Sequence, residues 1–194
     1  MTAWLVTAPT AEPISVADAK IQCRLPEDLT DLDNQIAAYI RAAREWAEVY
    51  TGRAFLTQTW DLKFDAFPSV IVLPKPPIAS VTSVSYIDTN GSTQTLSSSL
   101  YTTDLPTGPY AQPGRIVPAY GQTWPSTRDL PNAVTVRVVC GYGASASVPE
   151  AIKQAIRVKV ATMHHLAEAH VIGANYVPVA SADEHLLWPF KVWP

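Results

Sequence analysis

Residues 31–64 read DLDNQIAAYIRAAREWAEVYTGRAFLTQTWDLKF, and the spacing of the apolar residues changes within this stretch. In the first half, apolar side chains recur at steps of three and four residues, as they do on one face of a helix. They are Leu32, Ile36, Tyr39, Ile40, Ala43, Trp46, Ala47 and Tyr50. Gly52 follows where a left-handed C-terminal cap is needed, so we predict a helix that begins near Thr30 or Asp31 and ends near Thr51.

Beyond Gly52 the apolar residues alternate with polar ones, and a strand places such residues on opposite faces. The apolar set is Leu56, Trp60, Leu62, Phe64 and Ala66, and only Gln58 interrupts it. Further strand-like runs, separated by proline and glycine, cover residues 70–73, 81–87, 93–96, 114–117 and 133–140. Asn90-Gly91 predicts a two-residue hairpin turn between two of them.

Helical patterns lie on both sides of this β region. Ser15 and Asp18 form a capping-box pattern, which predicts a short helix over about residues 16–24. After Gly143, a stripe that includes Ile152, Ile156 and Val160 predicts a long helix ending near His170. Because the two long stripes are complementary, we expect these helices to pack on each other across the β insertion.

The predicted fold class is therefore α+β. It has a helical core of two N-terminal helices and one long C-terminal helix, with a mostly antiparallel β insertion and an extended C-terminal arm. The predicted divisions are 1–55 for the N-terminal part of the helical core, 56–143 for the β insertion, 144–173 for the C-terminal helix and 174–194 for the arm.

Composition excludes several classes of protein. The 194 residues carry a formal net charge of -3, so no overall positive field favours binding to a phosphate backbone. No apolar run reaches the roughly 18 residues that cross a bilayer, and Met1 to Pro9 lacks the features of a secretory signal. We expect a soluble protein made in the cytoplasm, with Cys23 and Cys140 as free thiols.

No pattern in the sequence points to catalysis, a cofactor or a metal. Ser97, Ser98 and Ser99 lack a nucleophile-elbow motif, and Asp61, Asp65 and Asp104 show no sign of an acid–base pair. His164 and Glu168 share a helix face, but a metal site needs further ligands, so we predict a structural or surface role for them. The chain is not predicted to be an enzyme.

The C-terminal residues are unusually apolar for a chain end. They include Leu186, Leu187, Trp188, Phe190, Val192 and Trp193. Two interpretations remain open: these side chains fold back over the protein's own core, or they form a docking arm that buries its aromatic rings against a partner.

Positive charge is concentrated on the predicted helical segments. The residues concerned are Arg41, Arg44, Arg53, Lys153 and Arg157. They are interpreted either as an ordinary solvated face or as contacts with acidic loops of a partner or with DNA passing nearby, in which case association would depend strongly on salt.

The order of these segments resembles that of the head-tail connector proteins of tailed phages, also called head-completion adaptors, and of the related gene transfer agent adaptor. The segments that carry the resemblance are residues 13–20, 36–47, 50–54, 58–60, 73–77, 81–84, 113–116, 141–143 and 186–193. They span nearly the whole chain. The large β insertion departs from the all-helical members of the family.

The resemblance implies a structural protein of the particle neck. It implies a ring of twelve identical subunits below the portal protein, which continues the DNA channel toward a tail stopper or tail-terminator protein. In such adaptors the helical core builds the ring and the C-terminal segment docks on the portal, which assigns that role here to residues 186–188, 190, 192 and 193. DNA would pass through without sequence-specific binding, and no membrane would be involved.

A carbohydrate-binding module is the alternative of a different class. Its stacking platform would draw on the aromatic residues of the β region, which are Trp60, Trp124, Tyr101, Tyr110 and Tyr120. A hydrolase with an unrecognised site is a third hypothesis, and no motif supports it.

Overall fold

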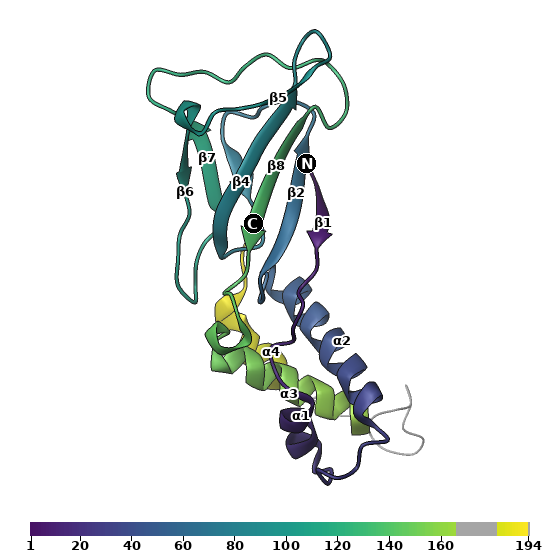
Figure 1. Cartoon of the computed structure of the whole chain (residues 1–194). Coiled ribbons are helices and arrows are strands. Elements are labelled where there is room, and N and C mark those ends of the chain that lie inside the picture. Colours follow the sequence, from purple (N-terminus) through teal and green to yellow (C-terminus); the bar gives the residue numbers. More distant parts are fainter. Residues whose placement is uncertain (166–181, 194) are drawn as a thin grey trace, which may run out of the picture.

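Strands and helices occupy opposite ends of the molecule (Figure 1). The computed structural model describes residues 1–165 and 182–193. The helical end contains α1 (Val16–Cys23), α2 (Asp33–Thr51), α3 (Glu150–His165) and α4 (Ala182–Leu187), and the last of these continues into the 3-10 turn η3 (Trp188–Phe190). This arrangement confirms the α+β class.

Local sequence signals fix the ends of the first two helices. At α1, Ser15 Oγ accepts the backbone N–H of Asp18 at 3.0 Å and the Asp18 carboxylate accepts the backbone N–H of Ser15 at 3.0 Å, so the predicted capping box is confirmed. Helix α2 ends at Gly52, whose φ of 71° is the predicted left-handed cap. The start of α2 lies at Asp33 and has no side-chain cap.

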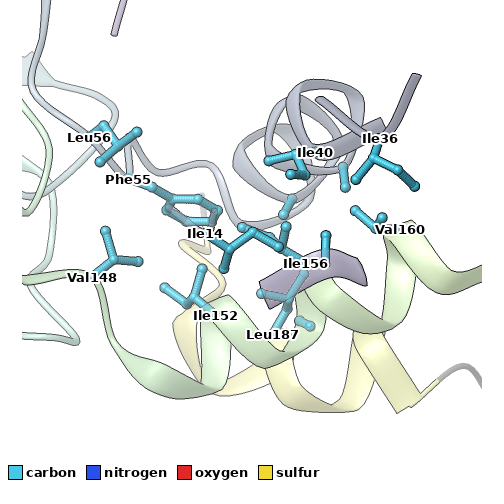
Figure 2. Packing of buried hydrophobic residues seen from close by; sticks show 14 of the residues in the cluster. Ile14, Ile36, Ile40, Phe55, Leu56, Val148, Ile152, Ile156, Val160 and Leu187 are labelled. Atoms are coloured by element: carbon cyan, nitrogen blue, oxygen red, sulfur yellow. The ribbon is translucent and has the colours of Figure 1, made fainter. Parts of the chain in front are cut away.

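The helical core forms where α3 packs against α1, α2 and α4. Figure 2 shows Ile36 and Ile40 of α2 beside Ile156 and Val160 of α3, which confirms that the two long stripes face each other. These four side chains are at most 1 % exposed. The predicted end of this helix near His170 lies outside the described residues.

The β end consists of two antiparallel sheets. The larger has the order β1-β2-β8-β4-β5, formed by β1 (Thr2–Thr7), β2 (Gln58–Phe64), β8 (Val134–Cys140), β4 (Ile78–Ile87) and β5 (Thr93–Thr95). The smaller has the order β3-β7-β6, formed by β3 (Ile71–Leu73), β7 (Gly114–Pro118) and β6 (Tyr101–Asp104). Side chains from both sheets fill a second core, separate from the helical one, that includes Leu62, Ile71, Val84, Ile116 and Val136.

Three features of the β end differ from the prediction. Strands β1 and β6 were not predicted, and most of their residues are exposed. The turn at Asn90-Gly91 belongs to a longer loop, 88–92, in which the Asp88 carboxylate accepts the backbone N–H groups of Asn90 and Ser92, both at 2.9 Å. A polar side chain thus supplies the turn's hydrogen bonds, and the loop is longer than two residues.

Both cysteines are free and buried, as predicted, and each lies in a different core. Burial raises the pKa of the Cys140 thiol to about 12. In the part of the chain that is described, no helix combines the length and apolarity that a bilayer crossing requires.

Candidate interaction surface at the carboxyl end

The C-terminal segment folds onto its own subunit. Leu187 of α4 is 0 % exposed and Phe190 of η3 is 3 % exposed, and both belong to the helical core (Figure 2 shows Leu187). Asp183 of α4 is buried and pairs with Lys159 of α3 at 3.4 Å. The predicted extended arm is therefore corrected, over residues 182–190, to a short helix and a 3-10 turn, because Leu187 and Phe190 find apolar partners in the core.

Hydrogen bonds fix the last residues at the junction between the helical end and the β end. The Arg53 guanidinium donates to the carbonyl oxygen of Phe190 and to that of Ala111, the latter at 2.7 Å. The backbone N–H of Val192 donates to the carbonyl oxygen of Thr51 at 2.8 Å. The Tyr110 ring stacks on Phe190 with 5.1 Å between centroids. Both ends of the molecule therefore hold the C-terminal segment.

Two tryptophans remain exposed on this fixed segment. Trp188 is 55 % exposed and Trp193 is 57 % exposed, and their rings meet edge to face at 5.2 Å. The Lys191 ammonium lies 4.9 Å from the Trp193 ring centroid, 5.8 Å from that of Trp188 and 5.3 Å from that of Tyr50 on α2. We call Tyr50, Trp188, Lys191 and Trp193 the aromatic surface.

The aromatic surface continues into the helical end through a second lysine. The Trp46 ring stacks on Tyr50 at 5.7 Å, and the Lys159 ammonium lies 4.0 Å from the centroid of Trp46. A continuous row of rings with two lysine ammonium groups over them therefore runs from α3 across α2 to the C-terminal segment. Cation–π attraction within this row favours a defined arrangement of the exposed rings.

The six residues predicted to dock fall into three groups. Leu187 and Phe190 are buried within the subunit, so their assignment to a partner contact is corrected. Leu186 and Val192 are half-buried, and only Trp188 and Trp193 are exposed.

The structure also divides the five positively charged residues. Arg44 is 6 % exposed and donates to Glu12 at 2.8 Å and to Glu48 at 2.9 Å, and Arg53 is 1 % exposed. Both are corrected from surface contacts to internal ones, because carboxylates and carbonyl oxygens of the same chain satisfy their donors. Lys153 and Arg157 pair with Glu150 at 3.7 and 2.5 Å. Arg41 is exposed and has no ion-pair partner among the described residues.

The Arg44 partner Glu48 organises the turn from α2 into β2, a role that the sequence did not reveal. Its carboxylate accepts the backbone N–H of Phe55 and the side-chain amide of Gln58, both at 2.8 Å. Burial raises the pKa of Glu48, against the opposing effect of these donors and Arg44. Gln58, the polar residue that interrupts the apolar alternation, is thus buried to bind Glu48.

The aromatic residues of the carbohydrate-binding alternative are engaged in separate contacts. The Lys75 ammonium lies 4.3 Å from the Trp60 ring centroid, Trp124 stacks on Phe67 at 4.9 Å and Tyr110 stacks on Phe190. Three of the five rings therefore already have partners within the chain, in three different places.

Within residues 1–165 and 182–193, no three His, Cys, Asp or Glu side chains gather as metal ligands would. Glu168 and His170 lie outside the described residues. His164 and His165 contact each other edge to face at 5.2 Å.

Solved structures share this fold over the full chain. The chain is similar to one in a structure described as the virion of a native gene transfer agent particle, with a TM-score of 0.78 and 22 % identity, over 100 % of this chain and 97 % of that chain. It is also similar to a chain in the neck of the empty particle computed with C6 symmetry, with a TM-score of 0.75 and 21 % identity. A chain in the neck of the native particle computed with C12 symmetry gives a TM-score of 0.70 and 20 % identity, and the coverage is the same in both cases. No curated protein matches the chain significantly.

A family model matches residues 13–105, just under half of the chain, and its description is phage gp6-like head-tail connector protein. The matched region begins just before the capping box of α1 and ends just after β6. It therefore includes the switch from helix to strand at Gly52. The resemblance inferred from the order of sequence segments is thereby confirmed over residues 13–105, which are similar to the phage gp6-like head-tail connector family.

Proposed function

We propose that this chain is a structural head-tail connector in the neck of a tailed phage or of a gene transfer agent-like particle. One observation carries the proposal: the whole chain shares its fold with chains of gene transfer agent particles, at a TM-score of 0.78 for a virion structure and 0.75 for a neck structure, while residues 13–105 match the connector family. The proposed role is assembly, without catalysis.

The proposed assembly is a ring of twelve identical subunits, in line with the C12 symmetry of the neck to which the chain is similar. A closed ring needs two different side surfaces on each subunit that meet by rotation. An elongated molecule with helices at one end and two sheets at the other offers such surfaces along its length (Figure 1). Arg41, Lys153 and Arg157 stay candidates for ring or channel contacts because their side chains reach the surface.

DNA would move through the centre of this ring. The net charge of -3 suits such a channel, because dense positive charge would hold the phosphate backbone. The side of the ring away from the portal would meet a tail stopper or tail-terminator protein. The site of action is the neck of the particle.

The aromatic surface is the proposed contact with the portal protein. Two tryptophans that are more than half exposed, on a segment held by hydrogen bonds, offer large apolar area without the entropy cost of ordering a loose arm. Leu186 and Val192 would form the rim of this contact. Leu187 and Phe190 would support it from inside the subunit.

Electron microscopy of the full chain mixed with its portal ring tests the proposal. We expect a collar at the narrow end of the portal, and the doubly substituted W188A/W193A chain should stay folded and form no collar. Y120A is the matched control, because Tyr120 is fully exposed and lies outside the aromatic surface. Absence of any association between the wild-type chain and the portal, at low and at high salt, would overturn the proposal.

A further inference from the structure

Lys191 lies at the centre of the aromatic surface and has no counter-ion among residues 1–165 and 182–193. Its ammonium is near the rings of Tyr50, Trp188 and Trp193, and no carboxylate of the described residues lies within ion-pair distance of it. Lys159 provides a comparison within the same chain. It also lies over a ring, that of Trp46, but it pairs with the buried Asp183 at 3.4 Å.

A partner cannot cover the two tryptophans without covering this ammonium. Trp188 and Trp193 are 5.2 Å apart, and the Lys191 ammonium is within 6 Å of both ring centroids. Burial of an ammonium without a counter-ion is costly, and attraction to aromatic rings offsets only part of that cost. A purely apolar partner surface would therefore bind this face poorly.

We infer that the protein that docks on the aromatic surface supplies a carboxylate to Lys191, from an aspartate or glutamate flanked by apolar side chains. This inference rests on the proposed function, and it assigns the carboxylate to the portal protein. Glu184 is exposed on α4 and acts electrostatically on Tyr50, a member of the aromatic surface. It forms no ion pair with Lys191, and no other carboxylate of the described residues does so, which supports a counter-ion from the partner.

Affinity of the full chain for the isolated portal ring, measured by biolayer interferometry, tests the inference. We expect K191R to bind within about threefold of the wild type, K191M about tenfold more weakly and K191E about a hundredfold more weakly. The wild-type affinity should fall with added salt, and that of K191M should fall less. K63M and K63E are the matched controls and should bind the portal as the wild type does. The Lys63 ammonium lies 4.6 Å from the ring centroid of Trp4 on β1, outside the aromatic surface.

The outcomes separate this inference from the proposed function. If W188A/W193A loses binding while K191M and K191E bind like the wild type, portal docking through the aromatic surface stands and the inference of a partner carboxylate is overturned. If W188A/W193A also binds like the wild type, docking through the aromatic surface fails. Loss of binding in E184Q would assign the counter-ion to this chain and overturn the inference. Light scattering that shows self-association through the same surface, abolished in K191E without the portal present, would also overturn it.

Discussion

Single residues decide how the helical end is joined to the β end. Arg53 follows the glycine cap of α2, and its guanidinium reaches two carbonyl oxygens that are 58 and 137 residues away in sequence. Burial lowers the pKa of Arg53, and the Tyr142 hydroxyl opposes this effect. The buried guanidinium of Arg53 is stabilised by these hydrogen bonds, which at the same time satisfy two backbone carbonyl oxygens.

Arg53→Met should destabilise the fold by about 3 kcal/mol, because the carbonyl oxygens of Phe190 and Ala111 lose their donor in a buried place. Urea unfolding followed by tryptophan fluorescence measures this change. Arg41→Met is the control, since Arg41 is exposed, and should stay within about 0.5 kcal/mol of the wild type. Equal midpoints for the two variants would contradict the role of Arg53.

Gly141 is a second residue that the junction requires. Its φ is 111°, and a Cβ there would collide with the backbone carbonyl of Leu56. Gly141→Ala should cost about 3 kcal/mol or more, since backbone rather than a flexible side chain would have to move. Gly121→Ala should cost about 1 kcal/mol, because Gly121 has a φ of 73° but nothing within 4 Å of its added Cβ. Thermal unfolding of both variants checks the difference, and similar melting temperatures would refute it.

At the scale of elements, the sequence predicted those with a strong local signal. The sequence predicts α2 because its apolar stripe and its glycine cap both lie within the helix and its next residue. It predicts β2 because the alternation of apolar and polar residues lies within the strand itself. Strand β1 was missed because it lies at a sheet edge, where Trp4, Leu5 and Val6 are all about half exposed and no buried face imposes a pattern. Arg44 and Arg53 were assigned to the surface because their partners are set by tertiary contacts that local spacing does not show.

The C-terminal segment illustrates the same limit for the candidate site. Its apolar composition predicts that it packs against protein, but the composition is the same for a side chain that enters the core and one that meets a partner. Leu187 and Phe190 enter the core, whereas Trp188 and Trp193 are exposed and could meet a partner. Only the position of η3 against the core separates them.

Helix α1 offers a pH-dependent prediction. The hydrogen bonds from Ser15 hold the pKa of Asp18 in the folded protein below its usual value. The ionised carboxylate therefore stabilises the folded state at pH values above the pKa that Asp18 has in the unfolded chain. This contribution is lost as the pH falls through the lower pKa of the folded state. The double variant S15A/D18N should be about 1 kcal/mol less stable than the wild type at pH 7. The difference should shrink between about pH 5 and pH 2.

Urea unfolding at a series of pH values measures this effect. Asp31→Asn is the control, since Asp31 is exposed and forms no hydrogen bond or ion pair among the described residues. If the difference in unfolding free energy between S15A/D18N and the wild type stays constant down to pH 2, the ionised Asp18 carboxylate does not contribute to stability.

At the scale of the whole molecule, one elongated chain holds two cores, and hydrogen bonds fix the aromatic surface near the junction of its two ends. The C-terminal segment bonds to α2 through Thr51 and, by way of Arg53, to the loop before β7. A force applied to the aromatic surface would therefore be transmitted to both ends of the subunit. This arrangement suits a neck component that carries load between two larger assemblies, in which a loosely tethered arm would transmit little.

In the proposed assembly, the aromatic surface, held by its own subunit, is where this chain meets the portal. A cryo-electron microscopy reconstruction of the chain bound to its portal ring, at a resolution that shows side chains, tests it most directly. Trp188 and Trp193 should be buried against portal side chains, with Leu187 and Phe190 still inside their own subunit. A collar in which both tryptophans face solvent, or in which the segment from Ala182 has left its core, would contradict it.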